Sequence, residues 1–246
     1  TLDRLYLPEG KTLYLCLNGH RITFDEYQVT LSNNTTLYLC DCSTEKTGTI
    51  SRSAGKTSCV LVSGENATFN MYSGTLRNGN RSYGGGVNVS AGTMNMYGGT
   101  ITENTATSDG GGIFVNTNGT LNLYGGTITK NTINVNEAHY GGGVYVESNK
   151  WLGVGKISIS GSPVITGNTR TYTDVKTGAV TTSTDNLFLS HGFTNSGDLP
   201  IIKLGTLTSG ANIGVSTKKA TAFSTASETD YSDYFFSDDA GYHVEY

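Results

Sequence analysis

Hydrophobic and polar residues alternate in short runs along most of this 246-residue chain. Each run is only a few residues long and is bounded by glycine or asparagine, which leaves no room for helices. An alternation of period two is typical of a β-strand with one buried and one outward face. The clearest alternating pairs are Val87 and Val89, Met94 and Met96, Ile113 and Val115, and Leu121 and Leu123. The pattern therefore predicts an all-β protein built from many short strands.

These runs belong to a repeat. Three of them follow a glycine triplet, as Gly-Gly-Gly-Val-Asn-Val at 84–89, Gly-Gly-Gly-Ile-Phe-Val at 110–115 and Gly-Gly-Gly-Val-Tyr-Val at 141–146. A second run ends in Tyr-Gly-Gly-Thr-Ile-Thr at 93–102 and 120–129, with looser copies at 68–76 and 157–165. Equivalent positions are 25 residues apart from Met71 to Met96, 27 from Met96 to Leu123 and 36 from Leu123 to Ile159. A unit this short cannot bury a core alone, so successive units must stack.

Stacking predicts a right-handed parallel β-helix, a solenoid of roughly seven to eight rungs with a C-terminal cap. We expect the β-helix to span residues 1–216, with a regular core at 68–168 and a threonine-rich loop at 169–185. Residues 217–246 are acidic and aromatic. Because the end of a solenoid exposes unpaired strands and core, we expect this segment to cover it.

Stacked rungs also turn equivalent residues into columns. Asn104, Asn131 and Asn168 share one turn position, where a buried amide can bond the backbone of the neighbouring rungs. Tyr72, Tyr97 and Tyr124 form a second column. We interpret both columns as structural.

The four cysteines are Cys16, Cys40, Cys42 and Cys59. They contain no CxxC pair and have no histidine at ligand spacing, which argues against a zinc site. Cys16 and Cys40 end the same tetrapeptide, Leu-Tyr-Leu-Cys, one period apart. Stacked strands would bring them within disulfide reach, so they form either a disulfide or a pair of stacked thiols. A bond between Cys42 and Cys59 is a further alternative.

Charge and hydropathy exclude two classes of partner. The net charge is −4, with no cluster of lysine and arginine, whereas nucleic-acid binding needs a basic surface. No apolar run approaches the length of a membrane span. No signal peptide opens the chain, and Thr1-Leu2-Asp3 resembles a cut inside a longer protein. The low content of lysine and glutamate and the few helix-forming residues suit an exported β protein, so we expect a monomeric module of a longer extracellular protein, either secreted or attached to a cell wall.

The repeat resembles the right-handed β-helix of the pectate-lyase-like superfamily. It is most similar to the modules of large secreted or wall-attached proteins of Gram-positive gut bacteria. The resemblance rests on Leu-Cys-Leu-Asn-Gly-His at 15–20, Leu-Cys-Asp-Cys at 39–42, the Tyr-Gly-Gly-Thr-Ile-Thr units, the glycine triplets, and segments 207–215 and 234–242. It covers nearly the whole chain and implies the fold. It does not imply one activity, because the superfamily includes lyases, hydrolases, adhesins and phage tailspikes.

The resemblance implies that an enzyme of this superfamily would place carboxylates on neighbouring rungs, because glycoside cleavage needs an acid and a base at a fixed separation. The acids between residues 60 and 168 are Glu65, Glu103, Asp109, Glu137 and Glu147, and none repeats in a column. Thr184-Asp185-Asn186 and Ser190-His191-Gly192 are faintly similar to hydrolase motifs, but no paired aspartates lie between them. We interpret these fragments as chance.

Binding is the stronger candidate. Tyr83, Asp109 and Tyr140 each precede a glycine triplet, and Leu61, Asn88, Phe114 and Tyr145 are the outward positions of the next strand. Bare glycine backbone edged by aromatic rings would form a shallow trough on which sugar rings stack. Inserts at 134–140 and 147–155, the second with Glu147 and Trp151, would lengthen its rim. The alternative is that the glycines permit a tight turn and the aromatic rings stack on each other.

The sequence thus predicts a non-enzymatic, extracellular surface module of the adhesin type, either glycan-binding or a structural stalk. The predicted ligand-binding residues are Tyr83, Asp109, Phe114, Tyr140, Tyr145, Glu147 and Trp151. The expected partner is a host or dietary glycan or a host surface protein, and we expect neither a metal nor a cofactor. The competing hypothesis is a carbohydrate-active enzyme, a polysaccharide lyase or a glycoside hydrolase.

Overall fold

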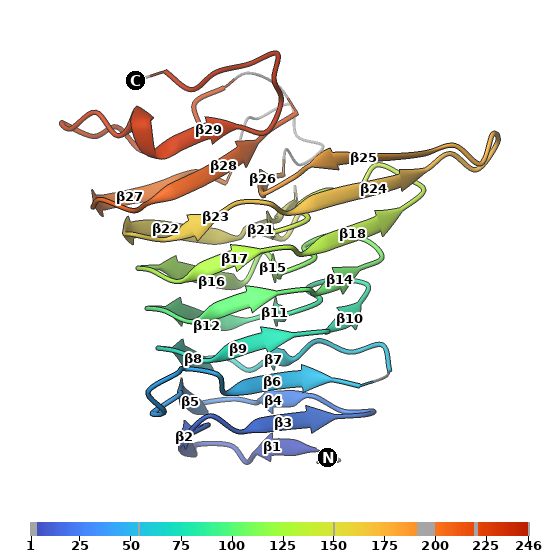
Figure 1. Ribbon diagram of the computed structural model, residues 1–246. Helices are drawn as coiled ribbons and strands as arrows, with labels where there is room; N and C mark the ends of the chain where they lie inside the picture. Colours follow the sequence, from blue (N-terminus) through green and yellow to red (C-terminus); the bar gives the residue numbers. More distant parts are fainter. Residues whose placement is uncertain (1–3, 54, 150, 191–199, 219–220, 246) are drawn as a thin grey trace.

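The computed structural model describes residues 4–53, 55–149, 151–190, 200–218 and 221–245. Figure 1 shows a stack of short strands, with the N-terminus at one end and the C-terminal segment at the other. Nearly all strand pairs along the stack are parallel and connect successive turns of the chain. The protein is therefore an all-β parallel β-helix, as the repeat predicts. The handedness of the coil and the number of rungs stay predictions. In the described ranges, no helix is long and apolar enough to cross a membrane.

One face of the helix is a 7-stranded parallel sheet. Its strands, in spatial order, are β2 (Thr12–Cys16), β5 (Thr36–Cys40), β8 (Thr68–Met71), β12 (Gly92–Met96), β16 (Gly119–Leu123), β22 (Lys156–Gly161) and β27 (Ile202–Leu207). The repeated Thr-x-Asn-x motif is in register here, since Asn95 lies opposite both Asn70 and Asn122.

The other two faces form a 15-stranded sheet that is continuous through β28 (Asn212–Ser216). The first consists of β1 (Leu5–Leu7), β4 (Val29–Leu31), β7 (Val60–Val62), β11 (Val87–Val89), β15 (Ile113–Val115), β19 (Val144–Val146) and β26 (Leu187–Leu189). The second consists of β3 (Arg21–Phe24), β6 (Thr49–Arg52), β9 (Thr75–Arg77), β13 (Thr100–Thr102), β17 (Thr127–Thr129) and β23 (Val164–Ile165). Finally, β29 (Phe235–Ser237) pairs with β28.

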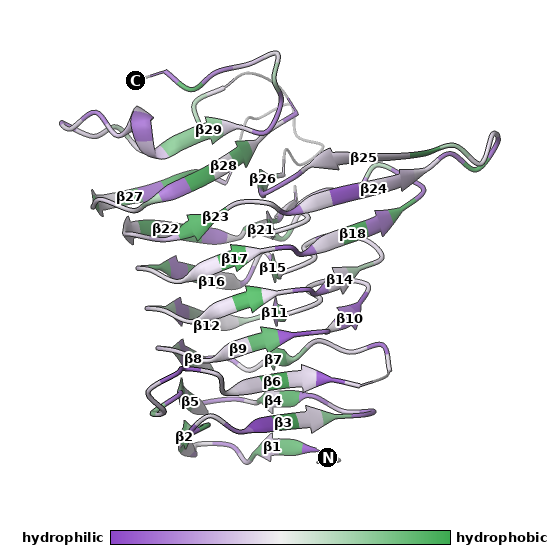
Figure 2. Ribbon diagram, viewed as in Figure 1, coloured by the Kyte–Doolittle hydropathy of each residue, from purple (hydrophilic) through white to green (hydrophobic). Residues whose placement is uncertain are grey.

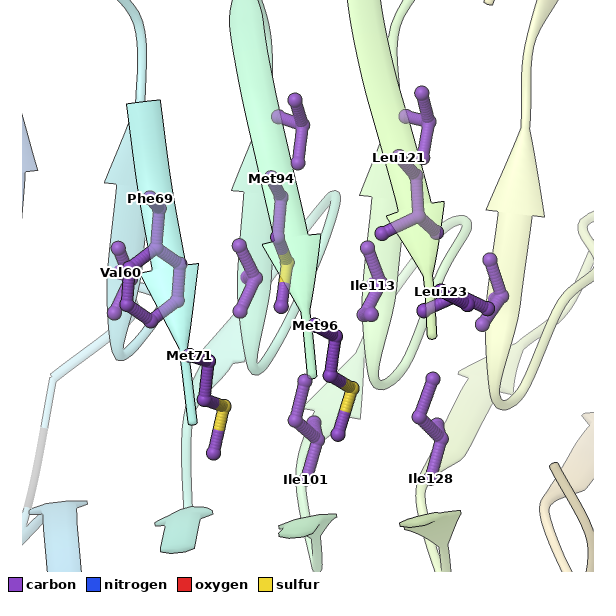
Figure 3. Packing of buried hydrophobic residues seen from close by; sticks show 14 of the residues in the cluster. Val60, Phe69, Met71, Met94, Met96, Ile101, Ile113, Leu121, Leu123 and Ile128 are labelled. Atoms are coloured by element: carbon purple, nitrogen blue, oxygen red, sulfur yellow. The ribbon is translucent and has the colours of Figure 1, made fainter. Parts of the chain in front are cut away.

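The inward side chains of all three faces form one core. Figure 3 shows Met71, Met96 and Leu123 from one face packing toward Ile101 and Ile128 of another. All five are almost completely buried, and each fully buried side chain of this size stabilises the fold by about 1.5–3 kcal/mol. In Figure 2 the hydrophobic positions of β9, β13, β17 and β23 fall one above another. The period-two alternation of the sequence is therefore the alternation between core and surface.

The predicted asparagine column is a continuous ladder of hydrogen bonds. Asn104, Asn131 and Asn168 are fully buried. The Nδ2 of Asn104 donates to Oδ1 of Asn131 (2.9 Å), and the Nδ2 of Asn131 donates to Oδ1 of Asn168 (2.9 Å). The ladder then continues through Asn186 (3.0 Å) to the carboxylate of Asp238 (2.5 Å). The repeat does not predict these last two members, because they lie outside its regular part.

The predicted tyrosine column is also present. The rings of Tyr72, Tyr97 and Tyr124 are stacked, with centroids 4.7 and 4.8 Å apart. Tyr14 and Tyr38 stack in the same way on the first rungs, 4.6 Å apart. Because each ring covers its neighbour, these tyrosines present mainly their edges and hydroxyl groups to solvent.

The expected loop at 169–185 is instead largely a β-hairpin. β24 (Thr169–Thr173) and β25 (Val180–Thr184) pair in antiparallel fashion. They extend a 5-stranded sheet whose other members are β10 (Asn80–Arg81), β14 (Thr105–Ala106) and β18 (Thr132–Val135). Figure 1 shows the hairpin projecting from the stack. Cross-strand hydrogen bonds, which need no apolar period, hold this threonine-rich segment in place.

The expected disulfide between Cys16 and Cys40 is wrong. These two residues are directly opposite in β2 and β5, as predicted, but Cys16 is bonded to Cys42 and Cys40 is a free thiol. The alternative bond from Cys42 to Cys59 is also wrong, because Cys59 is a free thiol in the core.

The C-terminal segment packs against the last rung. Phe223, Tyr231, Tyr234 and Val244 contact the core from positions near the end of the stack. The segment contains a short 3₁₀ turn, η1 (Ser232–Tyr234), followed by β29. Asp238 anchors it by accepting hydrogen bonds from the N–H and the Nδ2 of Asn186.

Candidate functional site

A cavity of about 420 Å³ lies on the outer surface of β7, β11, β15 and β19. It is lined by Leu61, Arg81, Tyr83, Asn88, Ser90, Asp109, Phe114, Asn116, Tyr145 and Glu147. We call this cavity the trough. Five of the seven predicted ligand-binding residues line it, namely Tyr83, Asp109, Phe114, Tyr145 and Glu147. The structure thus brings most of the predicted site together, and the binding role of these residues stays a prediction.

The register of the parallel strands determines which side chains line the floor of the trough. Asn88 lies opposite Leu61 on one side and Phe114 on the other, and Phe114 lies opposite Tyr145. These four side chains occupy the outward position between two inward valines or isoleucines in each strand. The same alternation that builds the core therefore lines up the floor.

The aromatic rings of the trough stack on each other, so fewer ring faces are open than a row of aromatic residues predicts. Tyr145 is sandwiched between Phe114 (centroids 5.6 Å apart) and Phe188 (5.7 Å). Phe114 is only 5% exposed, because the tilted ring of Tyr83 lies 5.0 Å from it on the other side. Tyr83 itself is 41% exposed. A sugar ring would therefore find one accessible aromatic surface, that of Tyr83, instead of a row of flat faces.

The glycine triplets do not leave bare backbone. The first glycine of each has a left-handed backbone, with φ of 68° at Gly84, 70° at Gly110 and 75° at Gly141. The second packs against the next rung, since a Cβ on Gly111 would lie 2.4 Å from the carbonyl oxygens of Thr132 and Gly142. The triplets thus serve the turn and the close stacking of rungs, which was the alternative interpretation.

Two carboxylates face this cavity. Asp109 is 8% exposed and accepts hydrogen bonds from the N–H of Tyr140 (2.8 Å) and from Nδ1 of His139 (3.0 Å) when that nitrogen is protonated. Burial raises the pKa of Asp109, although these hydrogen bonds act in the opposite direction. Burial also raises the pKa of Glu147, and the charge of Asp109 raises it further. The same two causes raise the pKa of the Tyr145 hydroxyl, which donates to Ser190 Oγ (2.9 Å).

Arg81 and Asn88 also line the trough, although neither is among the predicted ligand-binding residues. Burial lowers the pKa of the Arg81 guanidinium, and its NH1 has no hydrogen-bond partner among the described residues. Asn88 is 5% exposed and donates from Nδ2 to the carbonyl of Tyr83 (2.8 Å). Its Oδ1 has no partner in the described part of the chain. Arg81 lies opposite Ala106 in the next rung, so no repeated motif marks it.

The remaining two predicted residues lie outside the trough. Tyr140 stacks on Phe188 with centroids 4.3 Å apart, and Arg170 and Lys218 lie 5.0 and 5.5 Å from its ring. It contributes to the trough only through its backbone N–H. Trp151 is 83% exposed on the hairpin formed by β20 (Ser148–Asn149) and β21 (Gly153–Val154).

The fragments similar to hydrolase motifs form no accessible site. Asp185 is 4% exposed beneath the C-terminal segment, where burial raises its pKa to about 7 and the charge of Asp238 adds to the effect. His191 and Gly192 lie outside the described residues.

Two larger hollows, of about 580 and 690 Å³, lie against the C-terminal segment and along the outer edge of β22 and β27. Neither combines an arginine with one buried and one half-buried carboxylate, as the trough does. Comparison of the chain with family models, with curated proteins and with solved structures found no match. The case for a function therefore rests on the geometry of the trough.

Proposed function

We propose that the chain is an extracellular, non-enzymatic surface module whose trough binds a sugar unit of a host or dietary glycan. The observation that carries the proposal is the meeting of an exposed Tyr83 ring with Arg81, Asp109 and Glu147 around one cavity. In this proposal the chain belongs with the pectate-lyase-like β-helices and resembles the surface modules of Gram-positive gut bacteria.

The polar groups of the trough suit a sugar better than an apolar ligand. Sugar hydroxyls donate to carboxylates and accept from guanidinium and amide groups, while one ring face stacks on an aromatic side chain. Arg81 NH1 and Asn88 Oδ1 are buried and have no partner in the described residues, so a ligand that shifts the side chains covering them would gain a donor and an acceptor.

A glycan array followed by calorimetry with the best hit tests this proposal. Tyr83→Ala and Arg81→Met should each weaken binding by at least about tenfold, because each removes about 1.4 kcal/mol or more of contact. Trp151→Ala is the matched aromatic control outside the trough and should bind like the parent. Absence of any hit, or equal binding by Tyr83→Ala, would favour the structural stalk.

A second candidate is glycoside hydrolysis, since Asp109 and Glu147 share the cavity and both have raised pKa values. A carboxylic acid with a raised pKa suits a general acid, and its neighbour could act as base or nucleophile. Release of reducing sugar from the glycan that binds would support this candidate if Glu147→Gln abolished it. Binding without release supports the non-enzymatic proposal.

A further inference from the structure

Three of the four cysteine sulfur atoms of the chain form one cluster. The sulfur atoms of Cys16, Cys40 and Cys42 lie within 4.8 Å of one another. Cys16 and Cys40 end adjacent strands in register, and Cys42 follows two residues later with its side chain on the same outer surface. Cys16 and Cys42 are exposed and Cys40 is half-buried, so solvent ions reach the cluster.

The spacing of these sulfur atoms fits a tetrahedral metal ion. Zinc–thiolate bonds of about 2.3 Å at tetrahedral angles place two sulfurs about 3.8 Å apart. The Sγ atoms of Cys40 and Cys42 are 3.7 Å apart. The third sulfur, that of Cys16, is held by its disulfide to Cys42 and accepts a hydrogen bond from the Cys42 N–H (3.1 Å).

The backbone around the cluster is fixed independently of the disulfide. Buried Asp41 accepts hydrogen bonds from the N–H groups of Gly19 (2.7 Å), Ser43 (3.1 Å) and Gly48 (2.5 Å). The ammonium group of Lys46 donates to the carbonyl of Asp41 (2.7 Å). Together with the pairing of β2 and β5, these bonds keep the three cysteines adjacent when the disulfide is open.

We propose that Cys16, Cys40 and Cys42 form a redox-gated site for zinc or a similar thiophilic divalent cation. The site is closed in the disulfide form, which leaves only Cys40 as a ligand. An external dithiol opens it by transferring two electrons and two protons to the disulfide and becoming a cyclic disulfide itself. The cation then displaces the three thiol protons and binds three thiolates, with a water molecule as the fourth ligand.

Cadmium titration of the whole chain tests the proposal, because the sulfur-to-cadmium charge-transfer absorption reports thiolate ligation directly. The protein is reduced with dithiothreitol, freed of reagent without air, and titrated in parallel with the oxidised form. The reduced parent should bind one equivalent and the oxidised parent should bind at least about tenfold more weakly. Cadmium should also displace zinc from the reduced protein loaded with zinc, because the softer cation binds thiolates more tightly.

Two variants identify the ligands. Cys40→Ser keeps the Cys16–Cys42 disulfide and therefore the oxidised fold, yet after reduction it should bind cadmium at least about tenfold more weakly than the parent. Cys59→Ser, which changes the one cysteine outside the cluster, should bind like the parent. Equal binding by Cys40→Ser, equal binding by oxidised and reduced parent, or no charge-transfer band would each overturn the proposal.

Discussion

Buried asparagines occur in the interior ladder and in the trough, and of these only the ladder asparagines have partners for both side-chain atoms among the described residues. In the interior ladder, the amides of Asn104, Asn131 and Asn168 bond to one another and to backbone carbonyls. In the trough, Asn88 is almost equally buried, but its Oδ1 has no partner in the described chain. A satisfied buried amide stabilises a fold, whereas an unsatisfied one lowers its stability. The contrast separates asparagines that hold the stack together from one in the trough that the stack does not need.

The largest effect should come from breaking the ladder. Asn131→Ala should lower the free energy of unfolding by about 4 kcal/mol, because it removes the side-chain partner of the Asn104 N–H and of the Ile101 carbonyl in the core, and one of the two hydrogen bonds of Asn104 Nδ2. Guanidinium denaturation of the parent and the variant measures the loss. Asn88→Ala is the matched control and should lose no more than about 1 kcal/mol, since only one hydrogen bond is removed. Equal losses would refute the distinction between the two positions.

The next effect tests whether the glycine triplets belong to the stack or to the binding surface. Gly111→Ala should lower the free energy of unfolding by about 3 kcal/mol, because its Cβ would lie 2.4 Å from two carbonyl oxygens of the next rung. Gly178→Ala provides the control, since Gly178 has a φ of 71° but nothing within 4 Å of the added Cβ. It should lose only about 1 kcal/mol from the backbone conformation. An unchanged free energy of unfolding in Gly111→Ala would indicate that the triplets form an exposed surface of the trough and not a close contact between rungs.

The stability of the fold should depend on pH at Asp185, next to the place where the ladder meets the C-terminal segment. Burial raises the pKa of Asp185 to about 7 from its ordinary 3.8. A raised folded-state pKa means that ionisation opposes folding, so stability should fall as pH rises from about 4 to above 7. Asp185→Asn should raise the melting temperature at pH 8 and leave it nearly unchanged at pH 4, a gain of about 2 kcal/mol at the higher pH.

Asp174→Asn is the opposite control for this pH dependence. The N–H groups of Thr177 and Lys176 lower the pKa of Asp174, so its replacement should not stabilise the protein at pH 8. A stability profile of Asp185→Asn that falls as steeply as that of the parent would show that other groups cause the dependence.

The regular part of the fold could be predicted because repetition states the same information several times. Alternating pairs predicted the strands, and the same position in successive repeats predicted the asparagine and tyrosine columns. Features that depend on one residue only were missed. Arg81 has Ala106 as its counterpart, and the outward direction of Cys42 depends on the turn held by Asp41. The hairpin at 169–184 lacks an apolar period, since its outer strand is wholly exposed.

Five of the seven residues predicted to bind a ligand line the trough, whereas Tyr140 and Trp151 lie outside it and Arg81 was not predicted. Sequence spacing brought Asp109, Phe114 and Tyr145 together, but spacing does not show which ring faces remain open. Parallel rungs place consecutive aromatic residues close enough to stack on each other. The charged groups therefore carry more of the proposed binding than the aromatic rings do.

The smallest expected change in stability is also the sharpest test of the comparison. Glu147→Gln should raise the free energy of unfolding by a few tenths of a kcal/mol at pH 7, because it removes a half-buried carboxylate that Asp109 repels. The same change should weaken glycan binding by about tenfold if the carboxylate accepts from a sugar hydroxyl. If Glu147 served the stack, its replacement would have the opposite effect: it would lower the stability of the protein and leave glycan binding unchanged. Thermal unfolding and calorimetry on one preparation distinguish the two cases. A gain in stability together with a loss of binding assigns Glu147 to the ligand. A contact with a ligand can retain a residue whose replacement would make the isolated fold more stable.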